Sequence, residues 1–301
     1  MSFSTPPLIA PPKEEAIYPY RRVWRSLIQE TILIVAICGV VFVVFQYIGI
    51  DLPALVERGL ILLLAFLPLI LWFLFSRFAE TRVPEPRSGL NTTLMLSALS
   101  AAAIGVPLVN TVVQPAEWLS LEAAPVRILG YTLTAGIVQE FIKFLVVRYV
   151  SGPRALRIRD DSIAYCIAAA VGYMTVLNLI YVVNHAATPD MVALRVLHHM
   201  SINVAGSLIM SYGIAQTWFG RVNPLLMPLT LLVAALINGL AIPLRSGFAN
   251  ASLGLTSAIA SPIFSLAFST GIVTVAIGLV LFFYNVVEEQ ERISRESGSR
   301  L

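Results

Sequence analysis

Charge, histidine and cysteine are all scarce in this chain of 301 residues. Charged residues make up only 12% of it, and there are three histidines and two cysteines. Cys38 and Cys166 both lie inside apolar runs, so the sequence predicts neither a disulfide nor a cysteine-based zinc site. The net charge of +3 comes from loops and not from a basic domain, which argues against nucleic acid as a partner. The N-terminal region also lacks the short apolar stretch and small-residue cleavage site of a signal peptide.

Hydrophobic residues, in contrast, make up 57% of the chain. Apolar runs of about twenty residues recur, separated by proline, glycine and charged clusters, and each run is long enough to cross a bilayer as a helix. We therefore expect an all-α polytopic integral membrane protein with about eight transmembrane helices. The expected spans are 27–48, 59–76, 91–113, 126–150, 162–184, 191–219, 225–244 and 258–285. They form a membrane domain at 27–285, between a polar N-terminal segment at 1–26 and a charged tail at 286–301.

The basic residues of the expected loops are divided unequally between the two sides of the membrane. One set of loops carries fifteen of them and the opposite set carries four, namely Arg58, Arg127, Arg195 and Arg245. Cytoplasmic loops of membrane proteins carry the excess of Lys and Arg. With an even number of spans, this predicts a multi-pass protein of the cell membrane with both termini in the cytoplasm.

Glu140 and Lys143 lie inside the expected span 126–150, at about the middle of the bilayer. A charge at that depth costs several kcal/mol, so such residues are functional candidates. Their spacing of three, and the spacing of four between Gln139 and Lys143, places all three side chains on neighbouring faces of one helix. Two interpretations stay open: an ion pair that only holds helices together, or part of a functional site.

Further polar residues lie in the later spans and are expected to converge on the bundle interior, because polar groups in membrane helices face away from lipid. They are Asn178, His198, His199, Asn203 and Asn238. The three asparagines are more typical of hydrogen bonds between helices. Outside this set, Asp160 and Asp161 are expected to cap the helix that follows them, and Arg195 to extend toward the outer interface.

Several of these segments resemble the motifs of the PrsW-type intramembrane proteases, which are distant relatives of the CAAX-processing proteases. Residues 139–143 (Gln-Glu-Phe-Ile-Lys) resemble the family's Glu-Glu-x-x-Lys motif. Residues 160–165, with Asn178 further on, resemble the second region, and His198 with Gly206 eight residues later resembles the third. Residues 67–73, Glu80 and 84–87 resemble the loop ahead of the first motif. The resemblance covers about residues 67–238.

The resemblance implies a multi-span helical fold in a bacterial membrane and a peptidase acting on a membrane protein such as an anti-sigma factor. It implies a catalytic set that includes Glu140, His198, Lys143, Gln139 and Asn178. The set is incomplete by the family's own pattern. Gln139 stands where the family has a Glu, Leu177 where a Glu precedes the Asn, and Asn238 at or near the late His.

These departures remove groups that peptide hydrolysis needs. Hydrolysis requires a base and an acid, and a catalytic zinc requires three protein ligands and an open position. Glu140, His198 and His199 are the only weak candidates for metal ligands, and neighbouring histidines on a helix point about 100° apart. We therefore expect no cofactor, and a divalent metal has no support in the sequence.

The expected function is that of a catalytically weak or inactive relative of these proteases, which binds a membrane protein or serves as a subunit of a larger complex. The alternative is an active peptidase that cleaves a single-span membrane protein with Glu140 and His198 as its acid–base pair. A transporter is a third possibility, but residues 27–150 and 162–285 show no internal symmetry of the kind that many transporters have.

Overall fold

The structure, a computed structural model, describes residues 21–150, 155–219, 223–245 and 262–298, and every regular element in these ranges is helical. The elements are α2 (Val23–Val43), η1 (Val44–Ile48), α3 (Ala54–Leu71), η2 (Trp72–Arg77), α4 (Phe78–Glu80), α5 (Leu90–Ser100), η3 (Ala101–Gly105), η4 (Leu108–Val113), α6 (Pro115–Trp118), α7 (Ala124–Tyr131), η5 (Thr132–Gly136), α8 (Ile137–Val150), α9 (Arg159–Asn184), α10 (Pro189–Phe219), α11 (Leu226–Arg245) and α13 (Pro262–Gly298), where η marks a π-helical segment. The predicted all-α class is confirmed.

Six helices in the described ranges are long and apolar enough to cross a membrane. They are Val23–Ile48, Ala54–Glu80, Leu90–Trp118, Arg159–Asn184, Pro189–Phe219 and Leu266–Gln290, and the apolar part of α11 is shorter, at Leu226–Ile242. The chain is thus a multi-pass membrane protein, whereas the expected count of eight spans is not confirmed. The first helix begins at Val23, four residues before the predicted start. Most of the predicted N-terminal segment, and the connector at 246–261, lie outside the described residues.

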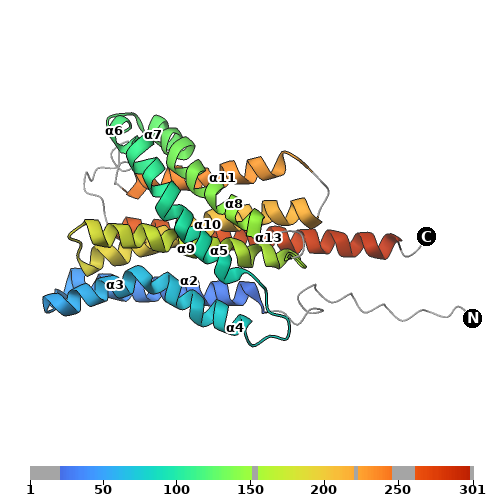
Figure 1. The fold of residues 1–301 in the computed structure, drawn as a ribbon, viewed down its shortest axis with the longest axis horizontal. Coiled ribbons are helices and arrows are strands. Elements are labelled where there is room, and N and C mark those ends of the chain that lie inside the picture. The colour runs from blue at the N-terminus through green and yellow to red at the C-terminus, as the bar shows by residue number, and fades with distance from the viewer. Residues whose placement is uncertain (1–20, 151–154, 220–222, 246–261, 299–301) are drawn as a thin grey trace, which may run out of the picture.

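The two helices α9 and α10 lie at the centre of the bundle and are the most enclosed (Figure 1). Helices α2, α3, α5, α11 and α13 pack around them. The middle of α9 is built from fully buried small residues, Ala168, Ala169 and Ala170. Small side chains let helix backbones approach closely, which is the main source of packing energy between helices in lipid.

A network of buried charges closes the end of the bundle where α2 begins. Arg21 Nε donates to Glu80 Oε2 at 3.0 Å, and Arg87 bridges Glu80 (Nη1 to Oε2, 3.1 Å) and Asp161 (Nε to Oδ1, 2.6 Å). Asp161 Oδ2 also accepts the backbone N–H of Ile158 at 3.0 Å, so it caps α9 as predicted. This network ties the start of α2 and the loop after α4 to the start of α9.

The pKa values of the two arginines in this network are shifted in opposite directions. Burial lowers the pKa of the Arg21 guanidinium, although Glu80 opposes this change. Burial also acts to lower the pKa of Arg87, but the carboxylates of Asp161 and Glu80 together raise it above its usual value. Since arginine stays protonated in proteins, both side chains act as permanent cations. The start of α2 and the end of α13 lie at this same end of the bundle (Figure 1).

Candidate functional site

The charged pair of α8 is completely enclosed. Glu140 and Lys143 each have 0% of their surface exposed, and Lys143 Nζ donates to Glu140 Oε1 at 2.7 Å. The two residues are three apart, so one helical turn brings them together. The predicted ion pair is confirmed, and it compensates for the cost of placing each charge inside the membrane domain.

Neighbouring helices supply further partners to the pair. Lys143 Nζ also donates to Asn203 Oδ1 at 3.2 Å and to Ser207 Oγ at 3.3 Å, both on α10. Asn238 of α11 donates its Nδ2 to Glu140 Oε1 at 2.8 Å. Asn203 and Asn238 therefore form the interhelical hydrogen bonds expected of them. Ser207 was missed by sequence reasoning, although its position one turn after Asn203 is a usable signal.

The second oxygen of Glu140 is in a different situation. Glu140 Oε2 is buried and has no hydrogen-bond partner among the described residues. Gly206 of α10 approaches the carboxylate so closely that a Cβ there would stand 2.7 Å from Glu140 Oε1. The carboxyl group is thus held from three sides, by Lys143, Asn238 and the bare backbone at Gly206.

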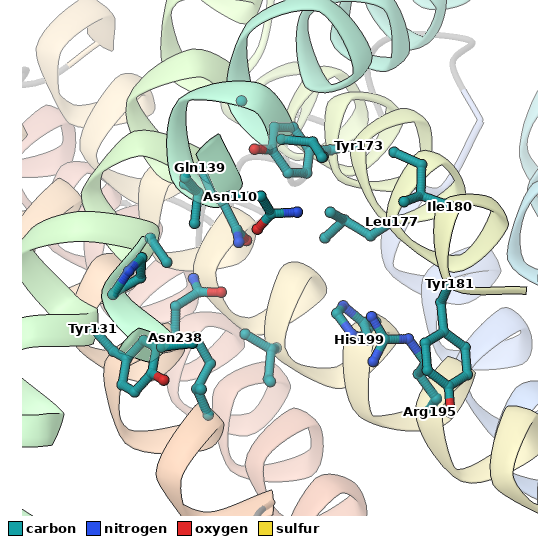
Figure 2. Close-up of a pocket in the computed structure, with 18 of the residues that line it drawn as sticks. Asn110, Tyr131, Gln139, Tyr173, Leu177, Ile180, Tyr181, Arg195, His199 and Asn238 are labelled. Atoms are coloured by element: carbon teal, nitrogen blue, oxygen red, sulfur yellow. The ribbon is translucent and has the colours of Figure 1, made fainter. Parts of the chain in front are cut away.

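A cavity of about 500 Å³ lies beside this pair, lined by segments from η3 to α11 (Figure 2). Its polar lining is rich in carboxamides, and in Figure 2 those of Gln139, Asn110 and Asn238 point toward one another. Within the described part of the chain, the side-chain amides of Gln139 and Asn110 make no hydrogen bond. Leu177 faces these amides from α9. Glu140 is not among the lining residues, whereas its hydrogen-bond partner Asn238 is.

The opposite wall of the cavity is aromatic and basic (Figure 2). The Arg195 guanidinium lies 4.0 Å from the centre of the Tyr181 ring, and this ring stacks on His185 with 4.6 Å between centroids. This cation–π contact holds Arg195 in the cavity wall, and its expected extension toward the outer interface stays a prediction. His185 is exposed and also lines the cavity.

The two histidines of α10 both line the cavity but point in different directions. Their ring centroids are 6.1 Å apart and the ring planes are nearly perpendicular, at 84°. His198 is buried, with a hydrogen bond of 3.1 Å between its Nδ1 and Ser269 Oγ of α13. Sequence reasoning did not find Ser269. The structure thus brings His198 and Gln139 to one cavity but gives His198 and Glu140 different hydrogen-bond partners.

Asn178 lies in the bundle interior as expected but lacks the expected hydrogen bond to any other described helix. It is 1% exposed, neither of its side-chain polar atoms has a hydrogen-bond partner among the described residues, and it does not line the cavity. Its neighbour Leu177 faces the cavity instead. The expected role of Asn178 as a hydrogen-bond partner between helices is therefore wrong for the described part of the chain.

A metal-dependent hydrolase needs three protein ligands around one ion. Across the described ranges, no group of three His, Cys, Asp or Glu side chains is arranged to hold one. Glu140 Oε1 already accepts hydrogen bonds from Lys143 and Asn238. The described residues do not fit a resident metal ion.

Comparison with known families gives one result, and it covers this whole site. The family model described as PrsW family intramembrane metalloprotease matches residues 85–267, more than half of the chain, including the pair of α8 and most of the cavity lining. No curated protein and no solved structure matches the chain significantly. The matched region contains the helices α5 to α11, whose packing builds the site described above. The chain belongs to the PrsW family of intramembrane metalloproteases.

Proposed function

We propose that this chain is a non-hydrolysing member of its family, which binds an extended segment of a membrane-protein partner in the cavity beside α8. The observation that carries the proposal is the enclosure of Glu140. Its Oε1 accepts bonds from Lys143 and Asn238, the side chain is 0% exposed, and it does not line the cavity.

A hydrolase acting at this site would need a base that can reach a water molecule in the cavity. Glu140 is the acidic residue that the family resemblance places there, and it is 0% exposed and not among the residues that line the cavity. The neighbouring positions add no further acid or base, since Gln139 and Leu177 stand where the family pattern has glutamates. A carboxamide does not titrate, and a leucine has no lone pair to offer.

The same substitutions suit binding. A carboxamide donates and accepts hydrogen bonds, as a peptide group does, so Gln139 and Asn110 can pair with an extended backbone. Such pairing matters in a membrane, because an unwound segment must have its N–H and C=O groups satisfied. The apolar lining residues Ile180, Ile202 and Ile242 supply contacts for side chains. A concave, largely apolar site with a few converging polar groups is the usual form of a binding pocket.

An active peptidase is the second candidate, and two observations favour it. His198 lines the cavity, and Glu140 Oε2 has no hydrogen-bond partner among the described residues. These two groups would have to act on one substrate as acid and base. Binding is the function we favour because Glu140 Oε1 already bonds to Lys143 and Asn238, while His198 Nδ1 shares a hydrogen bond with Ser269 of α13.

The test places a photo-crosslinking amino acid at Ile180, which lines the cavity. The control position is Leu133 of η5, which is 61% exposed and does not line the cavity. Each variant is co-expressed with candidate single-span membrane proteins. We expect a crosslink to an intact partner from position 180 and none from position 133. A cleaved partner would contradict the proposal if the cleavage disappears in both Glu140→Gln and His198→Ala while their folded amounts stay normal.

A further inference from the structure

A second hollow lies away from the cavity, on the surface where α2 begins and α4 ends. It has a volume of about 370 Å³. Four arginines line it, Arg21, Arg22, Arg25 and Arg82, together with the apolar side chains of Leu74, Phe75 and Phe78. We call this hollow the basic groove. Several arginines next to aromatic side chains indicate a binding site for an anion that also has an apolar part.

The positive charge of the basic groove is not neutralised from within. Arg21 is paired with Glu80 and is buried. Arg22, Arg25 and Arg82 are exposed and form no ion pair with a described residue. The guanidinium of Arg82 lies 4.3 Å from the centre of the Phe78 ring, a cation–π contact that holds it at the groove.

The nearby carboxylates are already engaged elsewhere. Glu80 accepts bonds from Arg21 and Arg87, and Glu30 accepts a hydrogen bond from Ser76. Among the described residues, neither carboxylate forms an ion pair with Arg25 or Arg82, and both cations line the hollow.

The position of the basic groove relative to the spans decides which anion fits. One candidate span starts at Val23 and the next span along the chain ends at Glu80, so the groove lies where two neighbouring spans meet the membrane surface. Just beyond the arginines, along the same helices, lie the lipid-accessible side chains Ile28, Leu74 and Phe78, which are 37%, 56% and 55% exposed. Basic groups at the boundary with apolar groups beside them match the two halves of a phospholipid.

We infer that the basic groove binds one anionic glycerophospholipid, with its phosphate between Arg25 of α2 and Arg82 after α4 and its acyl chains along Leu74 and Phe78. The guanidinium fork matches phosphate oxygens in geometry and charge. Basic residues next to a membrane span attract anionic lipid strongly at the cytoplasmic surface, which is the predicted location of this end. The inference is independent of the proposed function, since the groove and the cavity share no lining residue.

The test measures the thermal stability of the full-length protein, purified in a neutral detergent, during titration with three probes. The probes are dioleoyl phosphatidylglycerol, dioleoyl phosphatidylcholine and inorganic phosphate. The groove variant is Arg25→Gln/Arg82→Gln. The control variant, Arg58→Gln/Arg148→Gln, removes the same number of exposed arginines from elsewhere on the described surface.

We expect phosphatidylglycerol to raise the unfolding temperature of the wild type and of the control variant by several degrees, and the other two probes to have little effect. The groove variant should need about thirtyfold more phosphatidylglycerol for half of the shift, because it lacks two interfacial arginines and their combined attraction for anionic lipid, about 2 kcal/mol, corresponds to that factor. An equal response to phosphatidylcholine overturns the inference. So does an equal response to inorganic phosphate, which would identify a simple anion site. These two comparisons use the wild type alone and remain decisive if the groove variant does not fold.

Discussion

Gly206 of α10 faces the Glu140 carboxylate of α8, and a Cβ at this glycine would stand 2.7 Å from Glu140 Oε1 and 3.0 Å from its Cδ. The absence of a side chain at residue 206 is therefore what lets α10 approach the ion pair. That approach in turn brings Asn203 and Ser207, on either side of Gly206, within reach of Lys143. One glycine thus positions the oxygen ligands of a buried ammonium.

We expect Gly206→Ala to destabilise the protein by about 1–3 kcal/mol, the usual cost of forcing an extra carbon into a packed interior. The matched control is Gly271→Ala on α13, where a Cβ would meet no atom within 4 Å. Alanine favours a helix over glycine by about 1 kcal/mol, so the control should be neutral or slightly stabilising. The measurement is the thermal unfolding temperature of the two purified variants. Equal unfolding temperatures would show that α10 can move away from Glu140 without loss of stability.

Replacement of Lys143 by methionine should sharply reduce the folded amount of protein. The change leaves Glu140 buried without its cation, and breaking a buried pair costs about 3–5 kcal/mol. The double variant Lys143→Met/Glu140→Gln should recover part of the loss, since no charge is then left uncompensated. Folded protein can be quantified by fluorescence-detected size exclusion. If the double variant is as poor as the single one, the pair is not the source of the stability.

Sequence periodicity and hydropathy were enough to predict the helical class, the membrane setting and the Glu140–Lys143 pair, because these depend on spacing within one helix. The partners Asn203 and Asn238 could be named as candidates, but not matched to Lys143 and Glu140, because their contacts depend on how α8, α10 and α11 pack. The contact between Arg195 and Tyr181 could not be predicted for the same reason, because the two residues lie on different helices.

The cavity itself could not be predicted, since a hollow arises from the packing of several helices and leaves no periodic signal. Asn178 shows the limit of arguing from a motif. The resemblance marked this position as functional, yet rotation by one residue along α9 gives the cavity face to Leu177. Two residues adjacent in sequence point about 100° apart on a helix. An error of one residue in the assumed face therefore exchanges a side chain that lines the cavity for one that packs against a neighbouring helix.

The charge network at the start of α2 should be a major source of stability. Glu80 is 0% exposed and contacts both Arg21 and Arg87, so Glu80→Gln leaves two buried cations with one carboxylate fewer and should cost about 3–5 kcal/mol. The same substitution at Glu85 provides the control. Glu85 pairs with Arg157 at 2.7 Å but its side chain is 57% exposed, so Glu85→Gln should cost no more than about 1 kcal/mol. Denaturation midpoints of the two variants should differ accordingly, and similar midpoints would contradict a buried network.

The orientation of the bundle in the membrane follows from the excess of basic residues on one set of loops, and labelling of single cysteines can test it. Leu121, between α6 and α7, is 97% exposed, and α6 lies at the end of the bundle away from the end of α13 (Figure 1). Glu85 lies in the loop after α4, beside the charge network. The native Cys38 and Cys166 are both buried, so they should react little with a maleimide.

We therefore expect a membrane-impermeant maleimide, added to intact cells, to label Leu121→Cys and Ala186→Cys but not Glu85→Cys. After the cells are opened, Glu85→Cys should react as well, which shows that its thiol is accessible and was protected by the membrane. The physical reason is that Arg22, Arg25, Arg77, Arg82 and Arg87 share one end of the described bundle, and moving so many cations across the bilayer during insertion is unfavourable. Labelling of Glu85→Cys in intact cells would reverse the orientation, and it would then place the basic groove at the outer surface.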